Sequence, residues 1–316
     1  MSNNIFNVEQ LKTRLDKFLA EQLPGVSRGH IQNDIEAGVV KVNGEKQIVS
    51  KFVVRAGDSV EYTPSEKNDE VKAKNIPLKV LYNNHGLLII DKPAGLAVHP
   101  GAGFKGDSLA AALLFHFKDI HLVGEEGRNG IVHRLDKDTS GVMMVALTPV
   151  MYDHLKDSFA ERKVKKEYLA LVKGKIENQH GIIDSDLGKS KKDFRKYTTD
   201  AQDMGLPKKS LTEYTVLEHL RDPSNLDEYT LIVVKLHTGR THQIRVHMSS
   251  LGFPLVGDLL YGGKNVMKLG LGRQFLHARK IEVKLPDESW IEADSQLPGD
   301  LKDLLIKYGS QKAHQL

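Results

Sequence analysis

The chain has 316 residues and no cysteine, so it is long enough for two domains with buried cores but cannot form disulfides or thiolate metal sites. Lys and Arg number 45 against 41 Asp and Glu, a mildly basic balance that is compatible with a polyanionic partner without requiring one. The first residues lack a signal-peptide pattern and the longest apolar runs are strand-sized, so we expect a cytoplasmic protein without membrane contact.

Residues 8–64 are predicted to form a small α+β domain. Leu15, Phe18 and Leu19 are spaced to line one face of a helix. Asn43-Gly44 follows a short apolar run and is a strong hairpin signal, and Val60–Tyr62 is predicted to be the last strand. A charged segment with few apolar residues, 65–77, comes next and is predicted to be a linker.

Four short patterns in this first domain resemble the S-four domain, a small RNA-binding module. They are Arg14-Leu15-Asp16, Val26-Ser27-Arg28, Gly38-x-Val40-x-Val42-Asn43-Gly44 and Ala56-Gly57-Asp58-x-Val60. The resemblance implies RNA binding, and Arg14, Lys17 and Arg28, near the starts of two expected helices, are the predicted contacts. Residues 8–64 nevertheless hold eight Lys and Arg against eight Asp and Glu, so an amphipathic helix pair with solvated charges remains the alternative.

Residues 78–310 are predicted to form a larger domain on a mixed, mainly antiparallel sheet, which makes the whole chain an α+β protein. Strand-like runs recur with tight turns between them, at residues 79–82, 87–91, 142–147, 167–173, 211–218 and 229–236. Two helices are expected, over residues 150–161 and 241–251. Because strands and helices do not alternate regularly and no glycine-rich phosphate loop follows a strand, a nucleotide-binding parallel sheet is not expected.

The segment Gly130–Gly141 places four charged side chains and a histidine between two apolar runs. Charge between buried strands is unfavourable unless it is paired, so such a loop is typical of a functional site. The spacing of Asp136 and Asp138 imitates the start of a calcium loop, but the twelfth position is Leu147 instead of glutamate, which excludes that site. Asp136, flanked by two cations, is either an ionised carboxylate available as a nucleophile or part of a salt-bridged surface turn.

Two more residues have positions that suggest a role. Tyr168 lies in a run with apolar residues on both faces, so we expect a buried ring and a hydroxyl that needs a partner; a core tyrosine is the alternative. Arg245 lies at the edge of the apolar stripe that Ile244 and Met248 form on the helix 241–251. It either makes a fork-shaped pair with Asp136 or reaches water along its stem.

Several motifs, in order, resemble those of the RluA-type pseudouridine synthases, over most of residues 78–298. They are His133-Arg134-Leu135-Asp136-x-x-Thr139-Ser140-Gly141, Lys165–Ala170, Leu236–His247, Pro254–Gly262 and Leu276-His277-Ala278. The segment His99–Gly103 resembles the RluD branch of that family. Such enzymes break the bond from ribose to the uracil nitrogen, rotate the base and rejoin the sugar to carbon five, which requires no metal, redox partner or nucleotide cofactor.

The resemblance implies roles for the residues that match. Asp136 is the catalytic carboxylate and acts at the ribose, either on the anomeric carbon or through a glycal. Arg245 orients it, and Tyr168 stacks on the uracil and can take a proton during the rearrangement. The target nucleotide must leave the RNA stack, and Arg134 fills the vacated space.

A basic run, residues 189–197, holds five Lys and Arg, one Asp and two aromatic residues. Such a run is often a solvated loop. In a protein that acts on RNA it predicts phosphate contacts through Lys191, Lys192 and Arg195.

We therefore predict a monomeric enzyme that isomerises uridines of large-subunit (23S) ribosomal RNA and uses no cofactor. A synthase that acts on transfer RNA and a non-catalytic ribosome-assembly factor are the alternatives. A metal-dependent hydrolase is disfavoured, because His242 and His247 are five residues apart and no carboxylate completes a zinc site.

Overall fold

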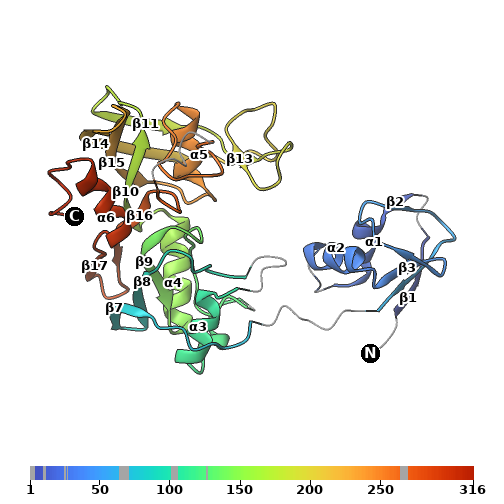
Figure 1. Cartoon of the computed structure of the whole chain (residues 1–316). Coiled ribbons are helices and arrows are strands. Elements are labelled where there is room, and N and C mark those ends of the chain that lie inside the picture. Colours follow the sequence, from blue (N-terminus) through green and yellow to red (C-terminus); the bar gives the residue numbers. More distant parts are fainter. Residues whose placement is uncertain are drawn as a thin grey trace. The chain divides into compact units, whose positions relative to one another are not determined.

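The structure is a computed structural model that describes residues 4–9, 12–24, 26, 28–63, 71–100, 106–125, 127–263 and 270–316. The chain divides into two compact units, Met1–Glu70 and Val71–Leu316 (Figure 1). Within the described ranges, every helix is too short or too polar to span a bilayer.

The first unit combines a four-stranded antiparallel sheet, in the order β1-β6-β3-β4, with a separate pair, β2-β5, and two helices. Its elements are β1 (Asn4–Asn7), β2 (Thr13–Arg14), α1 (Leu15–Gln22), α2 (Arg28–Ala37), β3 (Val40–Val42), β4 (Glu45–Gln47), β5 (Val53–Val54) and β6 (Ser59–Tyr62). The hairpin predicted at Asn43-Gly44 joins β3 to β4, and both turn residues have the positive φ that this turn requires. The predicted helical face is buried in the core of this unit.

The second unit is built on a nine-stranded sheet in the order β11-β14-β15-β10-β16-β9-β8-β7, with β17 paired to β16. Its strands are β7 (Lys79–Asn84), β8 (Leu87–Lys92), β9 (Ser140–Ala146), β10 (Lys165–Lys173), β11 (His180–Asp184), β14 (Leu211–Arg221), β15 (Glu228–Leu236), β16 (Leu276–Lys284) and β17 (Trp290–Asp294). Every pair is antiparallel except a short parallel contact between β16 and β9. The predicted mixed, mainly antiparallel sheet is confirmed, and so are the six predicted strands.

Apolar side chains bury this sheet on both faces. On one face, Tyr168 and Ala170 of β10 join a core that includes the helices α3 (Leu109–His116), α4 (Pro149–Ala160) and α5 (Gln243–Ser250). On the other face, Leu169 and Leu171 pack with α6 (Gly299–Lys307). Because successive strand residues point to opposite faces, this burial explains why the run around Tyr168 is apolar throughout.

The parallel contact between β9 and β16 depends on Gly141. Its φ is +118°, and a Cβ at this position would lie 2.1 Å from the carbonyl oxygen of Ala278. Only glycine allows the two backbones to approach so closely. Farther along, residues Lys280–Lys284 of β16 pair with β17 instead of β9.

Between β11 and β14 the chain leaves the sheet, and we call residues 185–210 the excursion. It contains the short pair β12 (Gly188–Lys189) and β13 (Tyr197–Thr198), and isolated bridges join Leu187 to Lys208 and Ser190 to Met204. The predicted basic run lies here, at the projecting loop labelled β13 in Figure 1.

Candidate active site

Asp136 lies in the loop that leads into β9, and backbone contacts hold this loop in place. The Thr139 N–H donates to the Asp136 carbonyl at 3.1 Å, and Nζ of the buried Lys92 donates to the Lys137 carbonyl at 3.0 Å. The Asp136 side chain is only 16% exposed. The loop therefore presents a carboxylate at a defined point above the sheet and not to bulk solvent.

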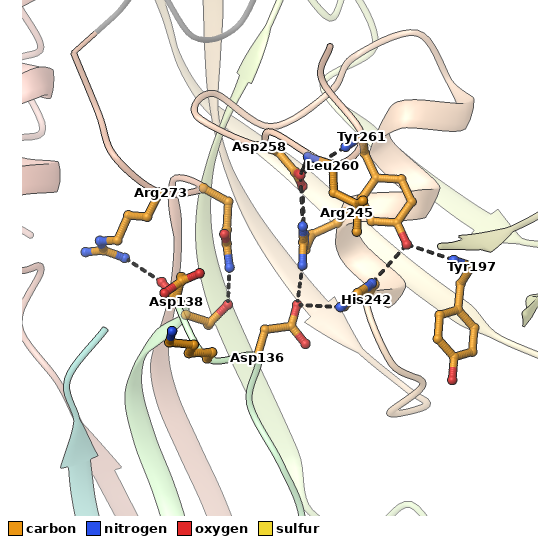
Figure 2. Close-up of polar contacts among 12 residues, drawn as sticks. Asp136, Asp138, Tyr197, His242, Arg245, Asp258, Leu260, Tyr261 and Arg273 are labelled. Carbon is orange, nitrogen blue, oxygen red and sulfur yellow. Dashed lines mark hydrogen bonds and ion pairs between the residues drawn. The ribbon is translucent and has the colours of Figure 1, made fainter. Parts of the chain in front are cut away.

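Arg245, on α5, contacts two carboxylates at once (Figure 2). Its Nη1 donates to Asp136 Oδ2 at 3.0 Å, while Nε and Nη2 donate to the two oxygens of the fully buried Asp258 at 2.7 and 2.9 Å. The ion pair with Asp136 that the helix position predicted is present, but the fork-shaped pair predicted for it is wrong. The fork binds Asp258, because Asp258 lies beside the Nε edge of the guanidinium, and Asp136 receives one nitrogen.

The charges around Arg245 stabilise its protonated form. Burial disfavours the cation, but hydrogen bonds and charge from Asp258, and then from Asp136, outweigh burial and raise the pKa of Arg245. The guanidinium also lies over the Tyr261 ring, 5.1 Å from its centroid. Arg245 is therefore a permanent cation shared between two anions.

Tyr168, on β10, lies in the same cavity as Asp136 and is 7% exposed. Burial, and then the negative charge of Asp136, raise the pKa of Tyr168. The resting phenol is therefore protonated, and it offers a ring surface and an O–H donor. The effect of Asp136 on this pKa disappears whenever Asp136 loses its charge.

His133, three residues before Asp136, links the loop to the sheet. Its Nε2 accepts the Met144 N–H at 2.8 Å, and its ring stacks on Phe159 at 4.7 Å. Burial, with a smaller contribution from the charge of Lys166, lowers the pKa of His133 to about 3, so the ring is neutral and can accept this bond. His133 therefore holds the loop against β9.

A cavity of about 500 Å³ opens beside these groups. Among the described residues, six cations and one carboxylate line it: Arg128, Arg134, Arg162, Lys166, Arg240, Arg245 and Asp136. Burial lowers the pKa of Lys166 to about 8. His99 also lines the cavity, and its Nε2 is buried without a hydrogen-bond partner. The excess of positive charge suits a polyanionic ligand around one reactive carboxylate.

The predicted RNA contacts fall into three groups. Arg134 is exposed at the cavity. In the first unit, Arg14 and Arg28 both donate to the fully buried Asp16, whereas Lys17 is exposed.

In the excursion, Lys191 and Lys192 are exposed, and Arg195 makes a two-pronged pair with Asp193. Part of the positive charge counted in the sequence is therefore already paired within the protein. Of the His99–Gly103 pattern, residues 101–103 lie outside the described residues.

Sequence reasoning missed three residues of this site: Asp258, His242 and Tyr261. His242 lies in the motif Leu236–His247, and Asp258 and Tyr261 lie in the motif Pro254–Gly262, but no catalytic role was assigned to them. An aspartate set in the largely apolar run Leu255–Tyr261 needs a buried partner, and this is the signal that could have been used for Asp258. No group of three or more His, Asp or Glu in the described parts of the chain has the geometry of a metal site.

Comparison with known proteins gives matches over most of the chain. A family model described as RNA pseudouridylate synthase matches residues 86–250, and an S4 domain model matches residues 13–60. An uncharacterized RNA pseudouridine synthase of Aquifex aeolicus is 41% identical over 261 residues, covering 82% of this chain and 80% of that protein. The ribosomal large subunit pseudouridine synthase D of Haemophilus influenzae is 36% identical over 311 residues, covering 94% and 91%.

A solved structure, human RNA pseudouridylate synthase domain containing 1, matches with a TM-score of 0.60 and 29% identity, covering 73% of this chain and 89% of that one. These matches agree with the resemblance that the motifs indicated. The chain belongs to the RNA pseudouridylate synthase family, carries an S4 domain near its N-terminus, and is an RNA pseudouridine synthase, an isomerase.

Proposed function

We propose that this synthase converts uridines of large-subunit ribosomal RNA into pseudouridine, with Asp136 as its catalytic carboxylate. The observation that carries this proposal is the position of Asp136, which is held by Arg245 at 3.0 Å inside a cavity lined by cations. An ionised carboxylate next to an extruded nucleoside can act at the ribose, either on the anomeric carbon or by way of a glycal.

Arg245 acts on the catalytic carboxylate, and Tyr168 acts on the uracil base. Arg245 orients Asp136 through the bond from its Nη1 to Oδ2. The Tyr168 ring provides a surface for the detached uracil while the base rotates. Once Asp136 has reacted and lost its charge, the raised pKa of Tyr168 falls, so the phenol gives up its own proton to solvent more readily. The phenolate formed in this way is the species that can accept the carbon-five proton.

RNA is held by groups around the cavity and beyond it. Extrusion of a stacked uridine costs a few kcal/mol, and Arg134, exposed at the cavity, occupies the space that the base leaves. Lys191, Lys192 and Arg195 of the excursion contact phosphates.

In the first domain, Arg14, Lys17 and Arg28 bind a second part of the RNA. We divide the chain into this RNA-binding domain, residues 8–64, a linker, 65–77, and a catalytic domain, 78–310. The three catalytic groups come from one chain, which supports a monomeric enzyme, and its substrate implies a cytoplasmic location.

The choice of ribosomal RNA rests on relatives named ribosomal large subunit pseudouridine synthase D. Pseudouridines should be mapped in total RNA from a strain that lacks the protein, from the same strain with the wild type restored, and from one with Asp136→Asn. We expect a large-subunit position to lose its modification and to regain it only with the wild type. Loss from transfer RNA alone would contradict the target, and restoration by Asp136→Asn would contradict the role of Asp136.

A further inference from the structure

His242 has an unusual backbone conformation at the start of α5. It is the N-cap residue, yet its φ is +58°, in the left-handed region, and its side chain makes no capping hydrogen bond. N-cap residues ordinarily have an extended backbone, and their side chains cap the helix. A non-glycine residue keeps a left-handed conformation where its surroundings hold it there. Here the conformation directs the imidazole to the cavity that contains Asp136.

The hydrogen bonds around His242 have a direction. The Tyr197 backbone N–H donates to the Tyr261 hydroxyl at 2.9 Å, and that hydroxyl lies 2.9 Å from His242 Nδ1 (Figure 2). In the described part of the chain, the hydroxyl has no other partner that could take its proton. It therefore donates to Nδ1, which places the imidazole proton on Nε2.

The proton on Nε2 faces the catalytic carboxylate. Burial lowers the pKa of His242 and keeps the ring neutral, against the negative charge of Asp136. Nε2 lies 3.9 Å from Asp136 Oδ2, the same oxygen that accepts the Arg245 bond. Catalytic hydrogen bonds are often long before substrate binds. If this distance shortens when RNA binds, two donors on one oxygen would restrict rotation of the carboxylate and leave Oδ1 to react.

On the basis of the proposed function, we propose that His242 is a positioning residue for Asp136, and that the Tyr261 hydroxyl connects it to the excursion. RNA seated against the excursion then fixes the orientation of the reactive carboxylate. Tyr197 contributes its backbone N–H, so a shift of the excursion changes the position of the Tyr261 hydroxyl and of His242.

A second cavity, of about 370 Å³, gives RNA a place from which to act on this connection. Tyr197 and Tyr261 both line it, together with Lys196. Asp200 and Asp203 line it too, which disfavours a phosphate and favours a ribose or a base. The occupant that fits is a nucleoside unit of the RNA close to the target uridine, and it would contact both tyrosines directly.

The test compares two single-atom deletions. Tyr261→Phe removes the hydroxyl of the connection and keeps the ring over Arg245. Tyr197→Phe is the matched control, because its phenolic oxygen lies away from the connection (Figure 2). In single-turnover assays on the natural RNA, we expect Tyr261→Phe to lower the rate constant about tenfold with KM within about twofold. Tyr197→Phe removes a hydroxyl that lines the second cavity, so it can raise KM, but we expect its rate constant to stay within about twofold of the wild type.

Two substitutions of His242 separate positioning from folding. His242→Gln places an amide near Nε2, towards Asp136, whereas His242→Asn places one near Nδ1, towards Tyr261. Asn tolerates the left-handed backbone better, so a purely structural role predicts that His242→Asn is the more active variant. We expect the reverse, with His242→Gln at least about fivefold faster, because contact with Asp136 is what matters.

Equal rates for Tyr261→Phe and Tyr197→Phe, or a His242→Asn variant as fast as His242→Gln, would overturn this proposal. Each variant is measured beside Asp136→Asn. If Asp136→Asn keeps full activity, the proposed function has failed. If Asp136→Asn is inactive and the tyrosine variants are equal, only the positioning role has failed.

Discussion

Asp258→Asn tests whether Arg245 needs its second carboxylate. Asp258 Oδ1 accepts bonds from Arg245 Nη2 at 2.9 Å, from Leu260 N at 3.0 Å and from Tyr261 N at 3.1 Å, while Oδ2 accepts from Arg245 Nε at 2.7 Å. Asparagine keeps one oxygen for the three donors on Oδ1. Its amide replaces Oδ2 and faces the Nε–H, so two donors meet and the negative charge is lost. The backbone turn at Leu260 and Tyr261 keeps its hydrogen bonds to residue 258, but the two-pronged pair with Arg245 is lost.

The expected cost follows from this geometry. Removing one partner of a buried ion pair costs about 3–5 kcal/mol, and Asp258 is fully buried. Asp136 remains 3.0 Å from Arg245 and compensates in part, so we expect the free energy of unfolding to fall by about 3 kcal/mol. Without the fork, the Arg245 guanidinium can rotate and no longer holds Asp136 in one orientation. We therefore expect kcat to fall about a hundredfold, which corresponds to about 2.7 kcal/mol.

Unfolding in urea and release of tritium from RNA labelled at carbon five of uridine measure the two effects. Asp300→Asn is the matched control, because Asp300 binds Arg273 with the same two-pronged geometry, at 2.6 and 2.9 Å, but is 46% exposed. We expect it to cost about 1 kcal/mol or less of stability and to leave kcat within about threefold. An Asp258→Asn enzyme that unfolds more easily yet turns over at the wild-type rate refutes the reasoning.

Three further predictions concern the catalytic loop and the strand after it. Asp136→Asn should bind RNA within about threefold of the wild-type Kd by filter binding and form no pseudouridine; weak binding would mean that the carboxylate serves folding. Gly141→Ala should destabilise the protein by at least about 3 kcal/mol, whereas Gly95→Ala, also at positive φ but with open space around it, should cost about 1 kcal/mol in the same urea melts. Because burial lowers the pKa of His133 from 6.5 to about 3, the neutral ring contributes stability that is complete above pH 6.5 and is lost as the pH falls towards 3. His133→Gln should therefore flatten this acid dependence, followed by Trp290 fluorescence, and an unchanged slope would contradict it.

Local pattern was sufficient for the strands that carry the site. The run around Tyr168 is apolar on both faces, which predicts a central strand, and β10 does lie between β15 and β16. The stripe of Ile244 and Met248 placed Arg245 at the edge of a buried face, and this residue reaches Asp136 from there. In both cases the periodicity of burial within one element determines where the side chain points.

Long-range pairing was beyond the sequence. Only the first three residues of β16, Leu276-His277-Ala278, were recognised in the sequence, as part of a motif. The second half of the strand, which pairs with β17, mixes charged and apolar residues and gives no clear strand pattern. Its parallel contact with β9 joins residues 137 positions apart, such as Ser140 and His277, and no local pattern reports such a contact. The same limit applied to charge. Position near the helix starts gave Arg14 and Arg28 as RNA contacts, and the basic run gave Arg195. Neither pattern could show that Asp16 and Asp193 already bind these arginines.

The division of Arg245 between two carboxylates has a chemical consequence. If its fork bound Asp136, both carboxylate oxygens would be held by strong hydrogen bonds, and a nucleophile so held must lose them to react. Because Asp258 takes the fork, Asp136 receives from Arg245 a single N–H on Oδ2, while Oδ1 has no hydrogen-bond partner among the described residues. The cost of burying the guanidinium is met by Asp258, which takes no part in the reaction. The reactive carboxylate is thus held in place by a cation whose charge is largely neutralised elsewhere.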